Sequence, residues 1–131
     1  MDGYRHRIMD SLLEKKLQAK GAVLIEGPKW CGKTTTAEEV AASKILLART
    51  DVKNNFKSLL EIDTDAALSG DTPMLIDEWQ TVPKLWDAVR YTVDHRRKMG
   101  QFILTGSAVP DKEAEEEREH SGTGRFAWLT M

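Results

Sequence analysis

The sequence lacks several features that define large classes of protein. It has one cysteine, Cys31, so no disulfide can form within the chain, which fits a reducing compartment and leads us to expect a cytoplasmic protein. No apolar run reaches the roughly 18 residues of a membrane-spanning helix. The N-terminus, Met1–Asp10, is charged and has no apolar secretory core. The formal net charge of −2 gives no overall basic field, so a nucleic-acid partner is not indicated.

What the chain does contain is enough for one folded domain. Its 131 residues, 40% of them hydrophobic and 31% charged, suit a single compact domain over residues 1–131 with a real core and a charged surface. Apolar residues at helical spacing predict an amphipathic helix over residues 4–19, within an N-terminal segment, 1–20, that precedes the core.

Short apolar runs alternate with helical patterns along the rest of the chain. The predicted strands are 22–26, 44–49, 74–76, 102–104 and 126–131. The predicted helices are 33–42, 52–68 with a break near Asp63, and 83–98, followed by a charged helix or disordered run over 111–119. Continuous apolar strands alternating with helices predict a three-layer α/β sandwich around a mainly parallel sheet. In such sheets ligands bind at the carboxyl ends of the strands.

The segment after the first predicted strand matches G-x-x-x-x-G-K-[ST] at every position. Its glycines let backbone N–H groups turn toward phosphates, and the helix that follows adds partial positive charge at its N-terminus. We expect Lys33 to reach the β- and γ-phosphates, and the Thr34 hydroxyl to ligate Mg²⁺. The motif predicts binding of a nucleoside triphosphate, ATP before any other. The predicted nucleotide-binding residues are Gly27, Pro28, Lys29, Trp30, Cys31, Gly32, Lys33, Thr34 and Thr35.

A second motif is a pair of carboxylates at the end of a buried strand. Asp77 and Glu78 directly follow the apolar run 74–76. Beside a phosphate loop, the first carboxylate is expected to hold Mg²⁺, usually through its water, and the second to orient the attacking water. The alternative is a solvated acidic pair at a strand terminus, which becomes the weaker interpretation beside a complete phosphate loop.

A third strand, 102–104, is followed by small hydroxyl residues. Thr105 or Ser107 could lie between Glu78 and the γ-phosphate and sense its presence. The alternative is ordinary hydroxyl capping where a strand enters a turn.

Together the motif segments resemble the bacterial and archaeal AAA-type ATPases that carry a C-terminal domain called DUF4143. The resemblance implies a P-loop core of the additional-strand (ASCE) type, in which the Thr105 strand lies between the phosphate-loop strand and the Asp77 strand. It also implies ATP as the nucleotide and a functional arginine, Arg125, acting in its own subunit or in a neighbouring copy; a surface or packing role is the alternative. The segments are 27–37, 75–80 (LIDEWQ), 83–90 (PKLWDAVR) and 100–110 (GQFILTGSAVP).

Members of that family usually continue beyond the point where this sequence ends, so the resemblance implies a truncated ATPase domain. We therefore expect ATP binding with Mg²⁺, and hydrolysis in the full-length protein, with a homo-oligomer left open. One alternative is a small-molecule or nucleotide kinase, which would need an acceptor pocket and an arginine-bearing lid. The other is a non-catalytic module in which the nucleotide stabilises a surface for a protein partner. Turnover assays with and without acceptors separate the three.

Overall fold

The computed structural model describes the backbone of residues 2–27, 33–107 and 126–130, and the side chains of residues 8–27, 34–106 and 126–129. Five strands form one sheet in the order β2-β3-β4-β1-β5, and every neighbouring pair is parallel. The α/β fold with a parallel sheet is therefore confirmed. The strands are β1 (Ala22–Gly27), β2 (Ser43–Leu46), β3 (Met74–Asp77), β4 (Phe102–Ser107) and β5 (Phe126–Thr130).

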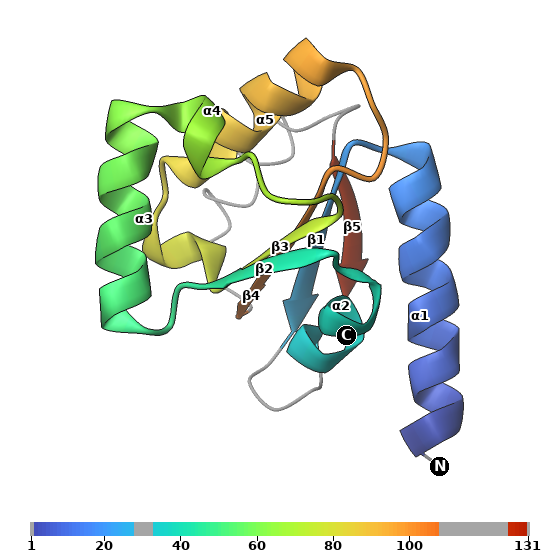
Figure 1. The fold of residues 1–131 in the computed structure, drawn as a ribbon. Coiled ribbons are helices and arrows are strands. Elements are labelled where there is room, and N and C mark those ends of the chain that lie inside the picture. Colours follow the sequence, from blue (N-terminus) through green and yellow to red (C-terminus); the bar gives the residue numbers. More distant parts are fainter. Residues whose placement is uncertain (1, 28–32, 108–125, 131) are drawn as a thin grey trace, which may run out of the picture.

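Helices cover both faces of this sheet, which gives the three layers expected from the sequence. Figure 1 shows α3, α4 and α5 on one side of the sheet and α1 and α2 on the other. Within the described part of the chain, no helix is long and apolar enough to cross a membrane. The helices are α1 (Asp2–Ala19), α2 (Lys33–Val40), α3 (Thr50–Ile62), α4 (Thr64–Ala67), the 3₁₀ helix η1 (Trp79–Thr81) and α5 (Leu85–Arg96).

Alternation of side chains along the strands fills two separate cores. On β4, Phe102 and Leu104 join the core beneath α3, α4 and α5, whereas Ile103 joins the core beneath α1 and α2. Full burial of a side chain of this size contributes about 1.5–3 kcal/mol. The pleat therefore decides which helical layer each apolar side chain packs against. It also decides toward which layer the polar side chains at the strand ends point.

Aromatic rings fill much of the core beneath α5. Trp86 of α5 stacks on Phe126 of β5 with ring centroids 4.0 Å apart, and Trp79 of η1 lies 5.3 Å from Trp86. Trp79 and Trp86 are each only 6% exposed. These tryptophans therefore hold β5 and η1 against the helical layer.

Several of the predicted helix and strand boundaries differ from the observed ones. β2 ends at Leu46 and not at residue 49, because the chain turns there, with the Arg49 amide donating back to the Leu46 carbonyl (3.3 Å). The break near Asp63 is confirmed, since its carboxylate caps α4 by accepting from the Ala66 amide at 3.1 Å. The helix predicted over 83–98 is shorter, Leu85–Arg96.

On α1, only part of the expected apolar face is covered: Ile8 and Leu12 are 44% and 38% exposed.

Candidate functional site

The carboxyl ends of β1, β3 and β4 meet at one end of the sheet. Gly27, the last residue of β1 and the first of the phosphate motif, pairs with Ser107 of β4. Asp77, the last residue of β3, pairs with Thr105, which also lies on β4. α2 begins at Lys33, so the helix that follows the phosphate motif starts at the position expected from the sequence. The two described ends of the motif, Gly27 and the start of α2, therefore lie beside the strands that carry the predicted polar residues.

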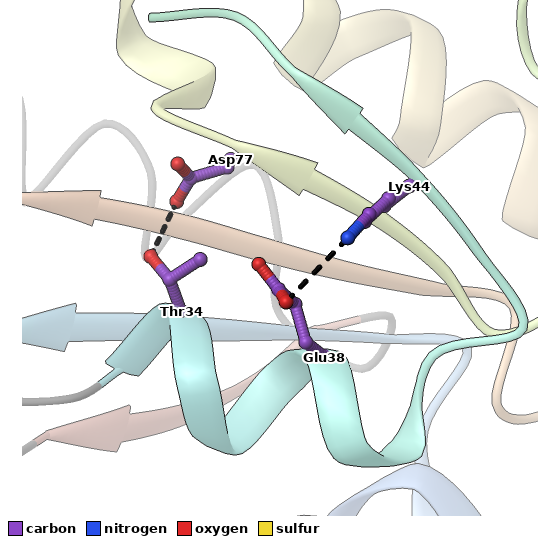
Figure 2. Close-up of polar contacts among 4 residues, drawn as sticks. All are labelled: Thr34, Glu38, Lys44 and Asp77. Carbon is purple, nitrogen blue, oxygen red and sulfur yellow. Dashed lines mark hydrogen bonds and ion pairs between the residues drawn. The ribbon is translucent and has the colours of Figure 1, made fainter.

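Asp77 is held by two hydroxyl groups from different elements. Its Oδ1 accepts hydrogen bonds from Thr34 Oγ1 of α2 at 2.9 Å and from Thr105 Oγ1 of β4 at 2.5 Å. Figure 2 shows the first of these bonds. Hydrogen bonds to an ionised acceptor are shorter and stronger than neutral ones, which suits a carboxylate that is only 9% exposed. Asp77 Oδ1 is thus fixed by Thr34 and Thr105, which are 43 and 28 positions from Asp77 in the sequence.

The pleat of the sheet explains why these groups meet. Leu75 and Ile103 face the layer of α1 and α2. Side chains two residues further along a strand return to the same face, so Asp77 and Thr105 point toward that layer as well. Thr34 stands in the first turn of α2, the helix on that side.

The oxygen atoms at this site have the chemistry that Mg²⁺ requires. Mg²⁺ takes hard oxygen ligands and usually keeps several waters, so one or two protein groups with phosphate oxygens suffice. Thr34 supplies a hydroxyl and Asp77 a carboxylate, with their oxygens 2.9 Å apart. Among the described residues, both hydrogen bonds to Asp77 use Oδ1, and none uses Oδ2. Among those same residues there is no cluster of three or more His, Cys, Asp or Glu that would suit a different metal.

A second contact fixes α2 further from the site. Figure 2 shows Glu38, one turn after Thr34, pointing toward Lys44 of β2. The carboxylate and ammonium lie 3.5 Å apart, and the two side chains are 38% and 54% exposed. An exposed pair of this kind contributes little to stability. The Thr34–Asp77 bond is thus the better-protected link between α2 and the sheet.

Glu78 stands on a sharp turn directly after β3. Its backbone is left-handed, with φ 58° and ψ 46°, which is uncommon for a residue with a side chain. The carbonyl oxygen accepts hydrogen bonds from the Thr81 amide (3.1 Å) and the Thr81 hydroxyl (2.9 Å). The carboxylate Oε2 accepts a hydrogen bond from Gln80 Nε2 at 2.5 Å. Both ends of Glu78 are therefore held within one turn.

The structure brings some of the predicted site residues together and leaves others undescribed. Thr34, Asp77 and Thr105 form one hydrogen-bonded group, with Glu78 next in the chain. Thr35 is exposed. Several predicted site residues lie outside the part of the chain that the structure describes. They are the side chains of Lys33 and Ser107, the residues Pro28, Lys29, Trp30, Cys31 and Gly32, and Arg125.

Two features of the site were missed from the sequence. The 3₁₀ helix η1 was not expected, and Gln80 was not singled out. The sequence did contain a signal for them. In LIDEWQ a polar residue, Gln80, stands two positions after Glu78, and Pro83 follows shortly after. Either Thr105 or Ser107 was expected to sense the γ-phosphate; the Thr105 hydroxyl is directed at Asp77, and the sensing role stays a prediction.

The parallel sheet has β4 between β1 and β3, and one of the two motifs begins at the end of each of those two strands, which defines a P-loop nucleotide-binding fold of the additional-strand type. Residues 19–131 match the family model AAA_14, described as an AAA domain, and the chain belongs to this family. It is thus a nucleotide-binding domain of the AAA ATPase type.

Two curated relatives are uncharacterized proteins, Mb2031c of Mycobacterium bovis and Rv2008c of Mycobacterium tuberculosis. Each is 34% identical over 100 residues, which make up 76% of this chain and 22% of the relative. The chain thus spans about a fifth of the length of these relatives. Among solved structures, C. elegans PCH-2 is similar with a TM-score of 0.47 and 15% identity, over 97% of this chain and 41% of that one. A likeness this distant has no bearing on function.

Proposed function

We propose that this chain binds ATP together with Mg²⁺, and that the complete gene product hydrolyses the ATP. The observation that carries the proposal is the hydrogen-bonded group of Thr34, Asp77 and Thr105 at the end of the sheet where the phosphate motif begins. A hydroxyl beside a carboxylate, next to a phosphate-binding motif, is the oxygen set that a nucleotide-bound Mg²⁺ requires. Membership of the AAA family supports ATP as the nucleotide.

Each residue then has a role in phosphoryl transfer to water, which depends mainly on positioning and charge neutralisation. Lys33 and the amides of the phosphate loop hold the phosphates, while Thr34 and Asp77 hold the metal. Bound Mg²⁺ would supply neutralisation of charge on the phosphate oxygens. Glu78 accepts a hydrogen bond from the attacking water. The water oxygen bonds to the γ-phosphorus while the bond from that phosphorus to the bridging oxygen breaks, and ADP leaves with the bonding electron pair. One proton of the water passes to the Glu78 carboxylate, which later releases it to solvent.

Three further assignments refine this proposal. We propose that Thr105 orients Asp77, on the strength of its buried 2.5 Å hydrogen bond. Ser107, paired with Gly27 of β1, is proposed as the group that responds to the γ-phosphate. Arg125 is proposed to stabilise charge in the transition state, in its own subunit or in a neighbouring copy within a homo-oligomer.

The finer family assignment is also a proposal. The segments LIDEWQ and ILTGS support membership of the ATPases that carry DUF4143. We also propose that the protein works in the cytoplasm, which its single cysteine fits. The downstream reading frame of the gene tests this, because a DUF4143 region would be encoded there. A frame without that region would overturn this part of the proposal.

Calorimetric titration with ATP and Mg²⁺ tests nucleotide binding. Replacing Lys33 with alanine removes a charge-assisted contact worth about 1.5–3 kcal/mol, so we expect affinity to fall by roughly tenfold to 150-fold. Lys57→Ala, which removes an exposed lysine of α3 on the opposite face of the sheet, is the matched control and should bind normally. Unchanged affinity in Lys33→Ala would contradict the proposal.

Product analysis tests the reaction class. Phosphate release from ATP and Mg²⁺ without any acceptor supports hydrolysis. Turnover that appears only when a small-molecule or nucleoside acceptor is added would indicate a kinase instead. Tight binding with no turnover in the complete gene product would indicate the non-catalytic module.

A further inference from the structure

The side-chain amide of Gln80 is bonded to the carboxylate proposed to orient the attacking water. Gln80 Nε2 lies 2.5 Å from Glu78 Oε2. An amide donor to an ionised acceptor makes a strong, directional hydrogen bond. Among the described residues this bond is to Oε2, so Oε1 is the oxygen that would accept from a water molecule.

The turn that carries both residues is fixed by its own backbone. The Glu78 carbonyl accepts from the amide and the hydroxyl of Thr81, and the Val82 amide donates to the Trp79 carbonyl at 3.0 Å. Trp79 is 6% exposed and packs against Trp86, so the turn is anchored in the core beneath α5. Because these hydrogen bonds close the turn and Trp79 anchors it, the fold itself keeps the amide next to the carboxylate.

The neighbouring strand leaves the space that the amide occupies. A Cβ atom added at Gly106 of β4 would lie 2.7 Å from Gln80 Oε1 and 2.9 Å from Trp79 Nε1. Contacts this short do not occur for real Cβ atoms, so a larger residue at this position would push the Gln80 amide aside. Gly106 directly follows Thr105, which binds Asp77. Two consecutive residues of β4 therefore affect the two carboxylates: Thr105 donates to Asp77, and Gly106 leaves room for the Gln80 amide that donates to Glu78.

From this geometry we propose that Gln80 is a positioning residue for ATP hydrolysis, acting only through Glu78. The inference rests on the proposed function. Gln80 holds the Glu78 carboxylate in one orientation before substrate arrives, so no reorganisation is needed at the moment of reaction. It contributes to the chemical step and not to nucleotide affinity, which depends on the phosphate loop and the metal site.

A positioning role fits the geometry better than a releasable latch. A latch requires its two halves to lie on elements that move relative to each other. Here donor and acceptor are two residues apart in the same closed turn. Their separation is therefore set by the fold and not by a conformational change.

The test is single-turnover hydrolysis and ATP affinity in the complete gene product, for the wild type, Gln80→Met, Glu78→Gln and the double variant. Methionine keeps the unbranched shape but cannot donate a hydrogen bond. We expect Gln80→Met to slow hydrolysis by roughly 10–100-fold, as is common when a group that orients a functional residue is lost. Affinity should stay within about twofold of wild type, because this contact matters only in the transition state. In the Glu78→Gln background the same change should have no further effect.

Two more variants keep the test decisive. Gln80→Asn retains the amide but shortens its reach, so it should show the same loss of rate even if Gln80→Met does not fold. Gln18→Met makes the same chemical change on the exposed surface of α1 and should behave as wild type.

The outcomes separate this inference from the function on which it rests. Equal slowing by Gln80→Met in the presence and absence of Glu78 would make Gln80 merely structural. A wild-type rate in a folded Gln80 variant, with Glu78→Gln impaired, would overturn the inference alone. A wild-type rate in Glu78→Gln would overturn the hydrolytic role of Glu78, and the role of Gln80 with it.

Discussion

The two carboxylates at the end of β3 are neighbours in sequence, yet different parts of the molecule hold them. Asp77 is bound by hydroxyls from α2 and β4, which are far away in the chain. Glu78 is bound by Gln80 and Thr81 within its own turn. The comparison teaches that the position of the first acid is a property of the assembled sheet, whereas the position of the second is a property of one local turn.

Their exposure differs in the direction that their proposed roles require. Asp77 is 9% exposed, and a buried carboxylate must be hydrogen-bonded to avoid a large desolvation cost. Glu78 is half-buried, which leaves its carboxylate within reach of water. A group that holds a metal needs rigidity, whereas a group that orients water needs access to it. The predictions that follow separate these two environments.

The largest effect should come from Glu78→Gln. The substitution keeps the shape of the side chain but removes the negative charge that polarises water. We expect single-turnover hydrolysis in the complete gene product to fall by about 10²–10⁴-fold, the usual range for general acid–base catalysis. Nucleotide affinity, measured in parallel by calorimetry, should change little. A matching loss of affinity would recast Glu78 as a structural residue.

Asp77→Asn should affect binding before chemistry. The amide keeps a carbonyl oxygen for the hydroxyls of Thr34 and Thr105 but lacks the charge that attracts Mg²⁺. Titration of ATP with and without Mg²⁺ should show that Mg²⁺ strengthens binding to the wild type, and that roughly tenfold or more of this gain disappears in the variant. If Mg²⁺ strengthens binding equally in both proteins, Asp77 has no part in holding the metal.

Thr105→Val should report on the support of Asp77 alone. Valine matches the shape of threonine but lacks the hydroxyl that donates to Asp77 Oδ1. Because the site is fully buried, the free energy of unfolding should fall by about 1–2 kcal/mol in urea denaturation. Thr105→Ser, which keeps the hydroxyl, is the matched control and should lose less. Wild-type stability in the valine variant would show that this hydrogen bond contributes nothing.

The smallest effect should come from Lys44→Ala. This change removes the exposed ion pair with Glu38, the other contact between α2 and the sheet in Figure 2. Screening by water limits such a pair to about 0.2–1 kcal/mol, so urea denaturation should change little. A loss above about 1 kcal/mol would mean that the exposed contact and not the buried one fixes α2.

The sequence by itself determined the local parts of this protein. The order of strand, phosphate motif and helix follows from an apolar run, a complete motif and helical spacing. The apolar runs 74–76 and 102–104 are each followed directly by a polar residue, so the sequence already placed Asp77 and Thr105 at the ends of their strands. Pairing of the strands in parallel followed from continuous apolar runs separated by helices.

Only the tertiary structure decided what those residues touch. Strand order depends on which strands pair, and no local pattern specifies that; here it was anticipated only through resemblance to known ATPases. The hydrogen bonds to Asp77 join residues 28 and 43 positions apart, so they exist only once β3, β4 and α2 are packed in register. The contact of Gln80 with Glu78 needed the left-handed turn after β3 and the absence of a side chain at Gly106, since the amide occupies that space.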